Sequence, residues 1–305
     1  MSRGSARVFC DWGSSRLRAF LECDAQIIER RDGPGIGRLG GESPAEALAN
    51  VLGSWRAHWK LDRVVLCGMA GSCNGVVEVP YVYGRVTFAQ WCAGACRAYI
   101  GGDVLMVLAG IQAENFRDVS DVMRGEETQI FGALALEETL AVGRQVIVLP
   151  GTHSKWVELD DGHVTRLQTY LTGELFDLLT TRSSLFRVGE MTEVDEAAFD
   201  VGLRKALRYD LAGNLFETRC VQLVEGRSAG WARSLLSGLL IGGEVHSMRT
   251  HHTVRSGPFT LIGEPALTAR YARALESYGV EARQLDGERC AVAGMRAAAD
   301  FLQEF

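Results

Sequence analysis

The sequence predicts a two-domain α/β protein in which each domain opens with a strand, a polar turn and a second strand. The chain has 305 residues, more than one hydrophobic core usually holds. Residues 8–24 run from an apolar strand through a glycine turn with hydroxyls to a second strand and an acidic turn, and residues 146–162 repeat that order. This echo indicates two related domains. We place their boundary near residues 141–144, which gives an N-terminal domain over 1–142 and a C-terminal domain over 143–305.

Alternation and capping signals predict the elements of the first domain. Residues 16–22 alternate basic and apolar side chains, as a half-buried strand does. Ser43 is an expected N-cap, with Pro44 at the first helical position and Glu46 completing a capping box. The expected strands are 8–12, 16–22, 26–31, 63–67 and 104–108, and the expected helices begin at 43–46 and span 126–140.

The second domain is predicted to combine a hairpin with longer helices. Residues 156–159 and 164–169 form the expected hairpin around an Asp-Asp-Gly turn. The C-terminal helix, at about 287–305, is expected to pack back on the first domain. The expected strands are 145–149, 156–159, 164–169 and 259–262, and the expected helices lie near 174–186, 193–210, 230–249, 265–278 and 287–303.

Composition excludes several classes of function. The chain carries 38 acidic and 32 basic residues, a formal net charge of −6, and no continuous basic stripe, so we expect no nucleic-acid partner. No signal-type apolar stretch precedes the first strand, and apolar runs such as 235–243 are too short for a bilayer. We therefore expect no membrane partner and a cytoplasmic protein. The eight cysteines form no CxxC pair and are expected to be reduced, mostly buried thiols.

The first turn that carries chemistry follows the first strand. Gly13 permits a tight turn, and the amides and hydroxyls of Gly13, Ser14 and Ser15 can donate to phosphate oxygens. Asp11 ends the strand and can hold Mg²⁺, which prefers a carboxylate together with waters and phosphate oxygens. An ordinary hairpin with an aspartate in its turn is the structural alternative.

A second donor-rich turn follows the strand at 145–149 and contains Gly151, Thr152, His153 and Ser154. Two such turns facing each other across an interdomain cleft would clamp a polyphosphate from both sides, which is the positioning that phosphoryl transfer requires. His153 either contacts phosphate or orients the backbone, and both remain open.

A third turn lies where the strand at 259–262 ends in Gly263 and a helix begins at Pro265. A nucleotide's adenosine could lie against this turn, and a plain β–α connection is the alternative. The chain contains no GxxxxGK[ST] string, which excludes a P-loop site. No GxGxxG string sits between a strand and a helix in the register of a Rossmann dinucleotide site, so we do not expect such a site.

Candidate substrate and catalytic residues lie in three further segments. Glu126 and Glu127 open a helix directly after a glycine, so either one could take the proton from a sugar hydroxyl, or both could be first-turn acids favoured by the helix dipole. Arg124 could bind a substrate carboxylate by a bidentate fork. Glu174 also begins a helix. It is a candidate substrate-binding residue with a metal or base role open to it, or else a solvated first-turn acid. The loop after the strand at 63–67 suits a small hydroxylated ligand or is a flexible connection, and its candidates are Gly68, Met69, Ser72, Asn74 and Tyr81.

Together these segments resemble the 2-dehydro-3-deoxygalactonokinase family, a branch of the actin/hexokinase/Hsp70 superfamily. The resemblance implies two ribonuclease-H-like, actin-like ATPase domains that close over ATP and a sugar acid. It implies ATP-dependent phosphorylation of 2-dehydro-3-deoxy-D-galactonate at its 6-hydroxyl, in galactonate catabolism. The strings that carry it come in family order: Asp-Trp-Gly-Ser-Ser at 11–15, Gly-Met-Ala-Gly-Ser at 68–72, Met-Arg-Gly-Glu-Glu-Thr-Gln at 123–129, Leu-Pro-Gly-Thr-His-Ser-Lys-Trp at 149–156, Thr-Gly-Glu-Leu at 172–175 and Ile-Gly at 262–263.

By analogy with the superfamily, Asp11 serves Mg²⁺, the loop around Thr152 serves the phosphates and the turn at Gly263 serves adenosine. We favour Glu126 over Glu127 as the base. The sequence departs from the family pattern after Ser72, where residues 75–77 are Gly-Val-Val in place of an expected Gly-Trp.

Other functions on the same fold remain as alternatives. One is a kinase for another sugar or sugar acid. A second is a non-catalytic sugar sensor, although the helix-turn-helix of such repressors would need room before the first strand, which begins around Arg7. A third is an ATPase that drives a partner. The sequence leaves the oligomeric state open, with a homodimer as one candidate.

Overall fold

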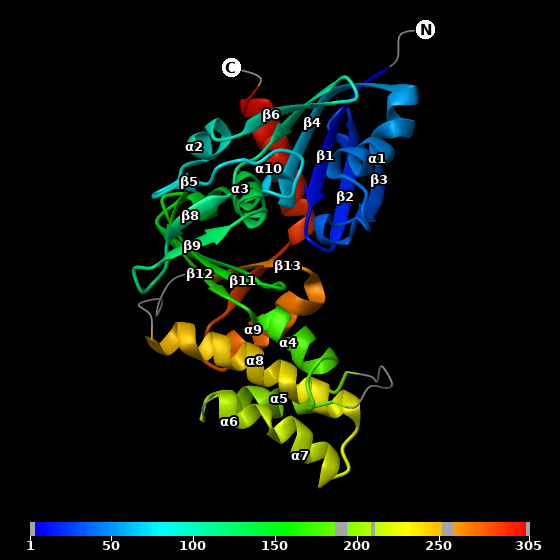
Figure 1. Ribbon diagram of the computed structural model, residues 1–305. Helices are drawn as coiled ribbons and strands as arrows, with labels where there is room; N and C mark the ends of the chain where they lie inside the picture. The colour runs from blue at the N-terminus through cyan, green and yellow to red at the C-terminus, as the bar shows by residue number, and fades with distance from the viewer. Residues whose placement is uncertain (1–3, 187–193, 209–210, 252–258, 303–305) are drawn as a thin grey trace. The chain divides into compact units, whose positions relative to one another are not determined.

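The computed structural model describes residues 4–186, 194–208, 211–251 and 259–302, and it divides into two compact units (Figure 1). The first unit comprises Met1–Arg144, Val157–Leu167 and Leu285–Phe305, and the second comprises Gln145–Trp156 and Gln168–Gln284. The described chain forms two large sheets and a small one, with helices packed on them. The predicted α/β class is confirmed.

A six-stranded sheet forms the centre of the first unit. Its strands are β1 (Gly4–Trp12), β2 (Arg16–Cys23), β3 (Gln26–Pro34), β4 (Trp59–Gly68), β6 (Cys96–Ile100) and β7 (Asp103–Val107), in the order β3-β2-β1-β4-β7-β6. β1 is antiparallel to β2 and parallel to β4, in a register that pairs Asp11 with Cys67. The ends of two parallel strands therefore bring the turn after β1 beside the loop after β4.

The first helix of this unit, α1 (Pro44–His58), begins as predicted. The hydroxyl of Ser43 accepts a hydrogen bond from the amide of Glu46, and the carboxylate of Glu46 accepts one from the amide of Ser43. The capping box is thereby confirmed. α1 packs against β3 and β4, on a sheet whose central strand β1 is buried on both faces at Val8, Phe9 and Cys10.

Two further helices of the first unit pack against each other. α3 (Glu126–Leu136) ends earlier than predicted because Glu137 leaves the helical region, with φ −137° and ψ 88°, and a 3₁₀ turn follows at Glu138–Ala141. α10 (Gly287–Phe301) packs against α3 and against β1 and β4. α10 also contacts the short helix α2 (Phe88–Ala93).

A small sheet that the sequence did not predict leads into α3. It consists of β5 (Val82–Tyr83), β8 (Ile111–Glu114) and β9 (Ser120–Met123), in that order. β8 pairs parallel to β5 and antiparallel to β9. Because β9 ends at Met123, this sheet fixes the backbone directly before Arg124.

The five-stranded sheet repeats the opening of the first sheet. Its strands are β10 (Arg144–Leu149), β11 (Ser154–Asp160), β12 (His163–Tyr170), β13 (Phe259–Gly263) and β14 (Ala282–Asp286), in the order β12-β11-β10-β13-β14. β10 pairs parallel to β13, as β1 pairs to β4. In both sheets, three consecutive strands lie side by side and the first also pairs with a later strand. The echo between residues 8–24 and 146–162 therefore reflects a repeated topology.

A long helix, α8 (Ala229–His251), organises the helical part of the second unit. Its buried residues Leu235, Leu236 and Leu239 form a core with Leu185 and Phe186. Around it lie α4 (Thr172–Thr181), α5 (Glu196–Ala206), α6 (Leu211–Leu215), α7 (Glu217–Leu223) and α9 (Pro265–Glu276), of which α6 and α7 were not predicted (Figure 1). Within the described residues, no helix has both the length and the apolar character that crossing a bilayer requires.

Candidate active site

The turn after β1 is held by backbone hydrogen bonds that leave its hydroxyl side chains exposed. The amide of Gly13 donates to the carbonyl of Arg16 at 2.9 Å, and the amide of Gly37 donates to the carbonyl of Ser14 at 2.9 Å. Ser14 and Ser15 are exposed. The predicted phosphate turn is thus a rigid loop with two accessible hydroxyls.

Asp11 lies at the end of β1 with 13% of its side chain exposed. Its carboxylate forms an ion pair with Arg18, and the Cys67 thiol approaches it at 3.8 Å. Within the described residues, no group of three or more His, Cys, Asp or Glu side chains lies close enough to hold a metal ion. One carboxylate is nevertheless compatible with Mg²⁺, which commonly takes one or two carboxylates together with waters and phosphate oxygens.

Two glycines bring the start of α3 against the end of β4. Gly68 has φ +72°, and a Cβ on it would lie 2.7 Å from the carbonyl oxygen of Trp12. Gly125 has φ +117°, and a Cβ on it would lie 3.3 Å from the Cα of Gly68. Positive φ and close backbone contact both favour glycine. Residues 124–127 are therefore positioned beside the ends of β1 and β4.

Arg124 is held on two sides. Its Nη2 donates to the carbonyl of Val79 at 2.8 Å, and its guanidinium lies 4.2 Å from the ring centroid of Tyr81. Its Nη1 is buried and has no hydrogen-bond partner among the residues that the structure describes. Buried donors are usually hydrogen-bonded, so an acceptor from a water or a ligand is expected here. The structure thus brings together Arg124 and Tyr81, two of the predicted substrate residues.

The two glutamates of α3 differ in their surroundings. Glu127 is fully buried, and both its carboxylate oxygens lie 2.8 Å from the amide of Gly125. Burial, together with the charge of Glu126, raises the pKa of Glu127 to about 8. Glu126 is half-buried, and its Oε2 accepts a hydrogen bond from the amide of Arg124 at 3.1 Å. Glu127 therefore keeps its proton at neutral pH, whereas Glu126 has partial access to solvent.

The loop after β4 is an ordered turn. The hydroxyl of Ser72 donates to the carbonyl of Met69 at 2.8 Å, and the amide of Gly75 donates to the carbonyl of Ser72 at 2.8 Å. Asn74 is exposed at the tip. The loop is therefore hydrogen-bonded within itself, and the Ser72 hydroxyl already has an acceptor there.

In the second unit, the first turn of α4 packs on the turn after β10. A Cβ on Gly173 would lie 2.4 Å from the carbonyl oxygen of Gly151, and the amide of Glu174 donates to the carbonyl of Thr152 at 2.9 Å. His153 Nε2 lies 2.5 Å from a carboxylate oxygen of Glu174. Glu174, a predicted substrate residue, thus pairs with a predicted phosphate residue and lies apart in sequence from the substrate candidates at 68–124.

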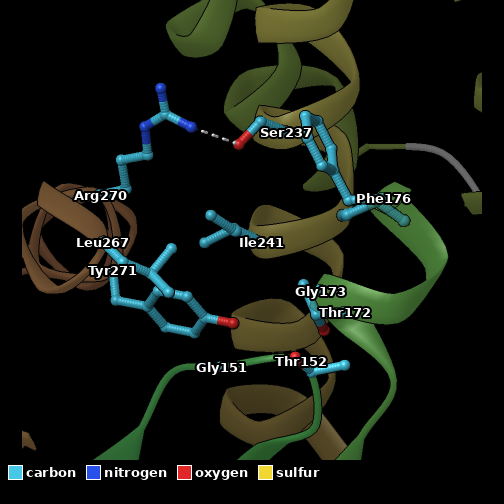
Figure 2. A pocket seen from close by; sticks show the side chains of 11 residues that line it. Gly151, Thr152, Thr172, Gly173, Phe176, Ser237, Ile241, Leu267, Arg270 and Tyr271 are labelled. Carbon is cyan, nitrogen blue, oxygen red and sulfur yellow. Dashed lines mark hydrogen bonds between the residues drawn. The ribbon is translucent and has the colours of Figure 1, made fainter. Parts of the chain in front are cut away.

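A cavity of about 310 Å³ adjoins this turn. Its size is within the range of roughly 300–1,000 Å³ that small-molecule sites occupy. Figure 2 shows Gly151 and Thr152 at one end, and Phe176, Ser237 and Arg270 at the other. The residues that line it come from the turn, α4, α8 and α9: Gly151, Thr152, Thr172, Gly173, Phe176, Ser237, Leu240, Ile241, Leu267, Arg270 and Tyr271.

The predicted adenosine turn at Gly263 is not part of this cavity. Gly263 does not line it, and a Cβ on Gly263 would lie 3.6 Å from the carbonyl oxygen of Pro150. The lining residues Leu267, Arg270 and Tyr271 belong to α9, the helix that follows Gly263. The helix after Gly263, and not the turn itself, therefore lines the cavity, and its residues were not among the predicted site residues.

Sequence reasoning also missed Glu244. The hydroxyl of Ser154 is fully buried and donates to the Glu244 carboxylate at 2.6 Å, so this hydroxyl is directed into the protein. Thr172, the first residue of α4, also donates to Glu244. The sequence does contain one indication of this residue, because Glu244 is the single charged residue in the segment 239–245, whose other residues are apolar or glycine.

Comparison with known proteins identifies the family. The family model described as 2-keto-3-deoxy-galactonokinase matches residues 11–298. This chain belongs to the 2-keto-3-deoxy-galactonokinase family. It is 35% identical over 297 residues to the 2-dehydro-3-deoxygalactonokinase of Escherichia coli strain K12. The aligned region covers 95% of this chain and 96% of that protein. The resemblance seen in the sequence is confirmed.

Solved structures agree with this family. A crystal structure from Sinorhizobium meliloti, of a protein assigned as a 2-dehydro-3-deoxygalactonokinase, is similar with a TM-score of 0.87 and 30% identity, covering 98% of this chain and 100% of that one. Acetate kinase from Entamoeba histolytica is similar with a TM-score of 0.50 and 9% identity, covering 99% and 100% of the two chains. At that identity the likeness concerns the fold alone, and it confirms the actin-like ATPase fold.

Membership of the 2-keto-3-deoxy-galactonokinase family makes the protein a kinase that uses ATP and acts in galactonate catabolism. A kinase of this family needs a nucleotide site, a group that binds the substrate carboxylate and a base. The structure describes a cavity beside Gly151 and Thr152, a buried guanidinium nitrogen at Arg124 and a half-buried carboxylate at Glu126.

Proposed function

We propose that the protein transfers the γ-phosphoryl group of ATP to the 6-hydroxyl of 2-dehydro-3-deoxy-D-galactonate, with Arg124 binding the carboxylate of the sugar acid. The buried, unpartnered Nη1 of Arg124 is the observation that carries the proposal. A guanidinium binds a carboxylate in a bidentate fork, and Val79 and Tyr81 already fix its orientation. A neutral hexose offers no such group, so this contact selects for an acid.

The nucleotide occupies the cavity of the second unit. Its phosphates lie at Gly151 and Thr152, and its adenosine lies against the apolar residues of α8 and α9. His153 contacts the phosphates, with Glu174 holding its ring, which gives Glu174 a positioning role in place of a direct substrate contact. Ser154 acts through its backbone, since its hydroxyl donates to Glu244.

In the first unit, the hydroxyls of Ser14 and Ser15 in the turn after β1 donate to phosphate oxygens. Gly13 serves by permitting the turn, since its amide donates to the carbonyl of Arg16. Asp11 would hold Mg²⁺, since this metal commonly takes one carboxylate together with waters and phosphate oxygens. Mg²⁺, when bound, neutralises charge on the transferring phosphoryl group. Arg18 holds the Asp11 carboxylate at the strand end, where the proposal places the phosphates.

Glu126 takes the proton from the substrate hydroxyl. It is half-buried, whereas Glu127 is enclosed and keeps its proton at neutral pH, with a pKa raised to about 8. An acid that is already protonated accepts no further proton. Glu127 instead holds the amide of Gly125 and so fixes the start of α3.

The remaining substrate contacts come from the loop after β4. Gly68 and Met69 lie where β4 ends, and the exposed Asn74 at the loop tip offers an amide to the hydroxyl groups of the sugar acid. Ser72 contributes by holding the loop, because its hydroxyl already donates to Met69. ATP and a catabolic sugar acid are both cytoplasmic metabolites, so we place the enzyme in the cytoplasm. Whether the enzyme is a homodimer is a separate question, which light scattering tests.

A coupled assay of ADP release tests the proposal. We expect 2-dehydro-3-deoxy-D-galactonate to stimulate ADP release strongly, related 2-keto-3-deoxy acids to do so less, and neutral hexoses not at all. A stronger response to another sugar acid would favour a kinase with a different substrate. ADP release that is equal with and without any acceptor would instead favour an ATPase that drives a partner.

A further inference from the structure

One buried carboxylate joins the walls of the nucleotide cavity. Glu244 lies on α8, three residues beyond the cavity-lining Ile241, and is 3% exposed. Its Oε1 accepts hydrogen bonds from Ser154 Oγ and Trp156 Nε1, both at 2.6 Å. Its Oε2 accepts from Tyr271 Oη at 2.7 Å and from Thr172 Oγ1.

The four donors come from three different elements around the cavity. Ser154 and Trp156 begin β11, directly after the turn that contains Thr152. Thr172 begins α4 and Tyr271 lies on α9, and both line the cavity (Figure 2). Glu244 itself adds α8, the fourth element. A single side chain thus fixes the spacing between the phosphate turn and the helices that face it.

The chemistry of these contacts requires a carboxylate. Trp156 can only donate, and an ionised carboxylate offers about four acceptor sites, one for each donor here. A glutamine has one acceptor oxygen, and its NH₂ group would face donors on the other side. Among the described residues, no lysine or arginine pairs with Glu244, so the four hydrogen bonds alone compensate its burial.

Burial of an uncompensated carboxylate is costly, and an apolar side chain of the same size would avoid that cost. Burial raises the pKa of Glu244, and the hydrogen bonds from Ser154, Thr172 and Trp156 oppose that rise. Burying this carboxylate therefore costs folding free energy, but its four hydrogen bonds hold several elements in one geometry.

We propose that Glu244 is a positioning residue for nucleotide binding, which holds the turn at Gly151 and Thr152 at the distance from α4 and α9 that the phosphates and adenosine of ATP require. The identity of the ligand rests on the proposed function. Glu244 contacts no nucleotide itself. It acts through Ser154, Thr172 and Tyr271, so its loss weakens nucleotide binding without affecting the sugar-acid residues around Arg124.

Isothermal titration calorimetry of Glu244→Gln with a non-hydrolysable ATP analogue tests this proposal. Loss of hydrogen bonds to a charged group corresponds to a rise in the Kd of about tenfold or more. The KM for the sugar acid at saturating ATP should change by less than about twofold, since its binding energy comes from other residues. Ser234→Ala is the matched control, because this buried α8 hydroxyl accepts from the amide of Asp195 and does not line the cavity.

Single-donor variants separate positioning from a general loss of stability. Thr172→Val and Tyr271→Phe should each raise the nucleotide Kd in the wild-type background. Each should add little in the Glu244→Gln background, because residues of one network are non-additive. If Glu244→Gln does not fold, the cycle between Thr172→Val and Tyr271→Phe provides the same test of coupling through Glu244.

The possible outcomes are distinct. A Glu244→Gln protein with a lower Tm but an unchanged nucleotide Kd, or fully additive donor variants, would overturn the positioning role alone. A wild-type protein that fails to bind the analogue would overturn the proposed nucleotide cavity and this inference with it.

Discussion

The backbone amide of Gly125 lies 2.8 Å from both carboxylate oxygens of Glu127, at the start of α3. The carboxyl group is enclosed, and its pKa is raised to about 8 from an ordinary value of 4.5. This contact ties the conformation of the Arg124–Glu126 segment to a buried acid. It therefore predicts how stability responds to pH and which glutamate serves as the base.

Glu127→Gln should flatten the pH dependence of stability. Between about pH 4.5 and pH 8, the unfolded chain ionises Glu127 while the folded protein keeps it protonated, so the free energy of unfolding falls as pH rises. The stability of the wild type relative to Glu127→Gln should fall across this window by an amount on the order of a few kcal/mol. Urea unfolding at a series of pH values measures it, and a constant difference from pH 5 to pH 8 would contradict the account.

Glu126→Gln should abolish turnover while nucleotide still binds. Loss of a general base lowers kcat by about 10²- to 10⁴-fold. The Kd for an ATP analogue should remain close to that of the wild type, because the nucleotide cavity is built from other residues. Glu138→Gln, an exposed acid just after α3, is the matched control and should leave kcat unchanged. Unchanged kcat in Glu126→Gln would discard this assignment.

Arg124→Lys should weaken binding of the sugar acid more than it slows catalysis. Lysine keeps the charge but loses the planar fork, the bond to Val79 and the stacking on Tyr81. We expect the KM for the acid to rise by about tenfold or more, in line with a lost charge-assisted hydrogen bond. Steady-state kinetics measure this. Arg85→Lys, an exposed arginine paired with Asp160, is the control, and an equal rise in both variants would count against the role of Arg124.

Gly173→Ala should displace the phosphate turn. The added Cβ would lie 2.4 Å from the carbonyl oxygen of Gly151, so the backbone has to move at a cost of about 1–3 kcal/mol. Both the Tm and the affinity for an ATP analogue should fall. Gly53→Ala, within α1 and with open space around its Cβ, should instead raise stability by up to about 1 kcal/mol without changing nucleotide affinity. Normal nucleotide binding by Gly173→Ala would show that the turn tolerates this movement.

Local patterns were sufficient to predict much of the fold. The capping box at Ser43 depends on residues three apart, and the strands at 16–22 and 164–169 are long enough to show their period. The small sheet was missed because β5 has two residues and β8 and β9 have four each, too few for alternation to be recognised. The end of α3 was placed too late because Glu137 has no breaker beside it in sequence.

The candidate site residues also fall into two groups, those that the sequence could name and those that it could not. The glycine and acidic motifs at Gly13, Glu126 and Gly151 are visible as strings, so their residues could be named in advance. The role of Glu244 depends on four donors spread from Ser154 to Tyr271, which only the folded chain brings together. The free nitrogen of Arg124 likewise depends on Val79 taking the other one. The sequence shows that these charged residues are present, but it does not show which hydrogen-bond partners the fold gives them.

The most direct test of the central claim is the structure of the product. The protein is incubated with ATP and 2-dehydro-3-deoxy-D-galactonate, and the mixture is followed by ³¹P NMR with proton coupling. The account predicts a phosphate monoester whose signal is split by the two protons on C6, formed at the same rate as ADP. Inorganic phosphate as the only phosphorus product besides ADP, or an ester on another carbon, would contradict it.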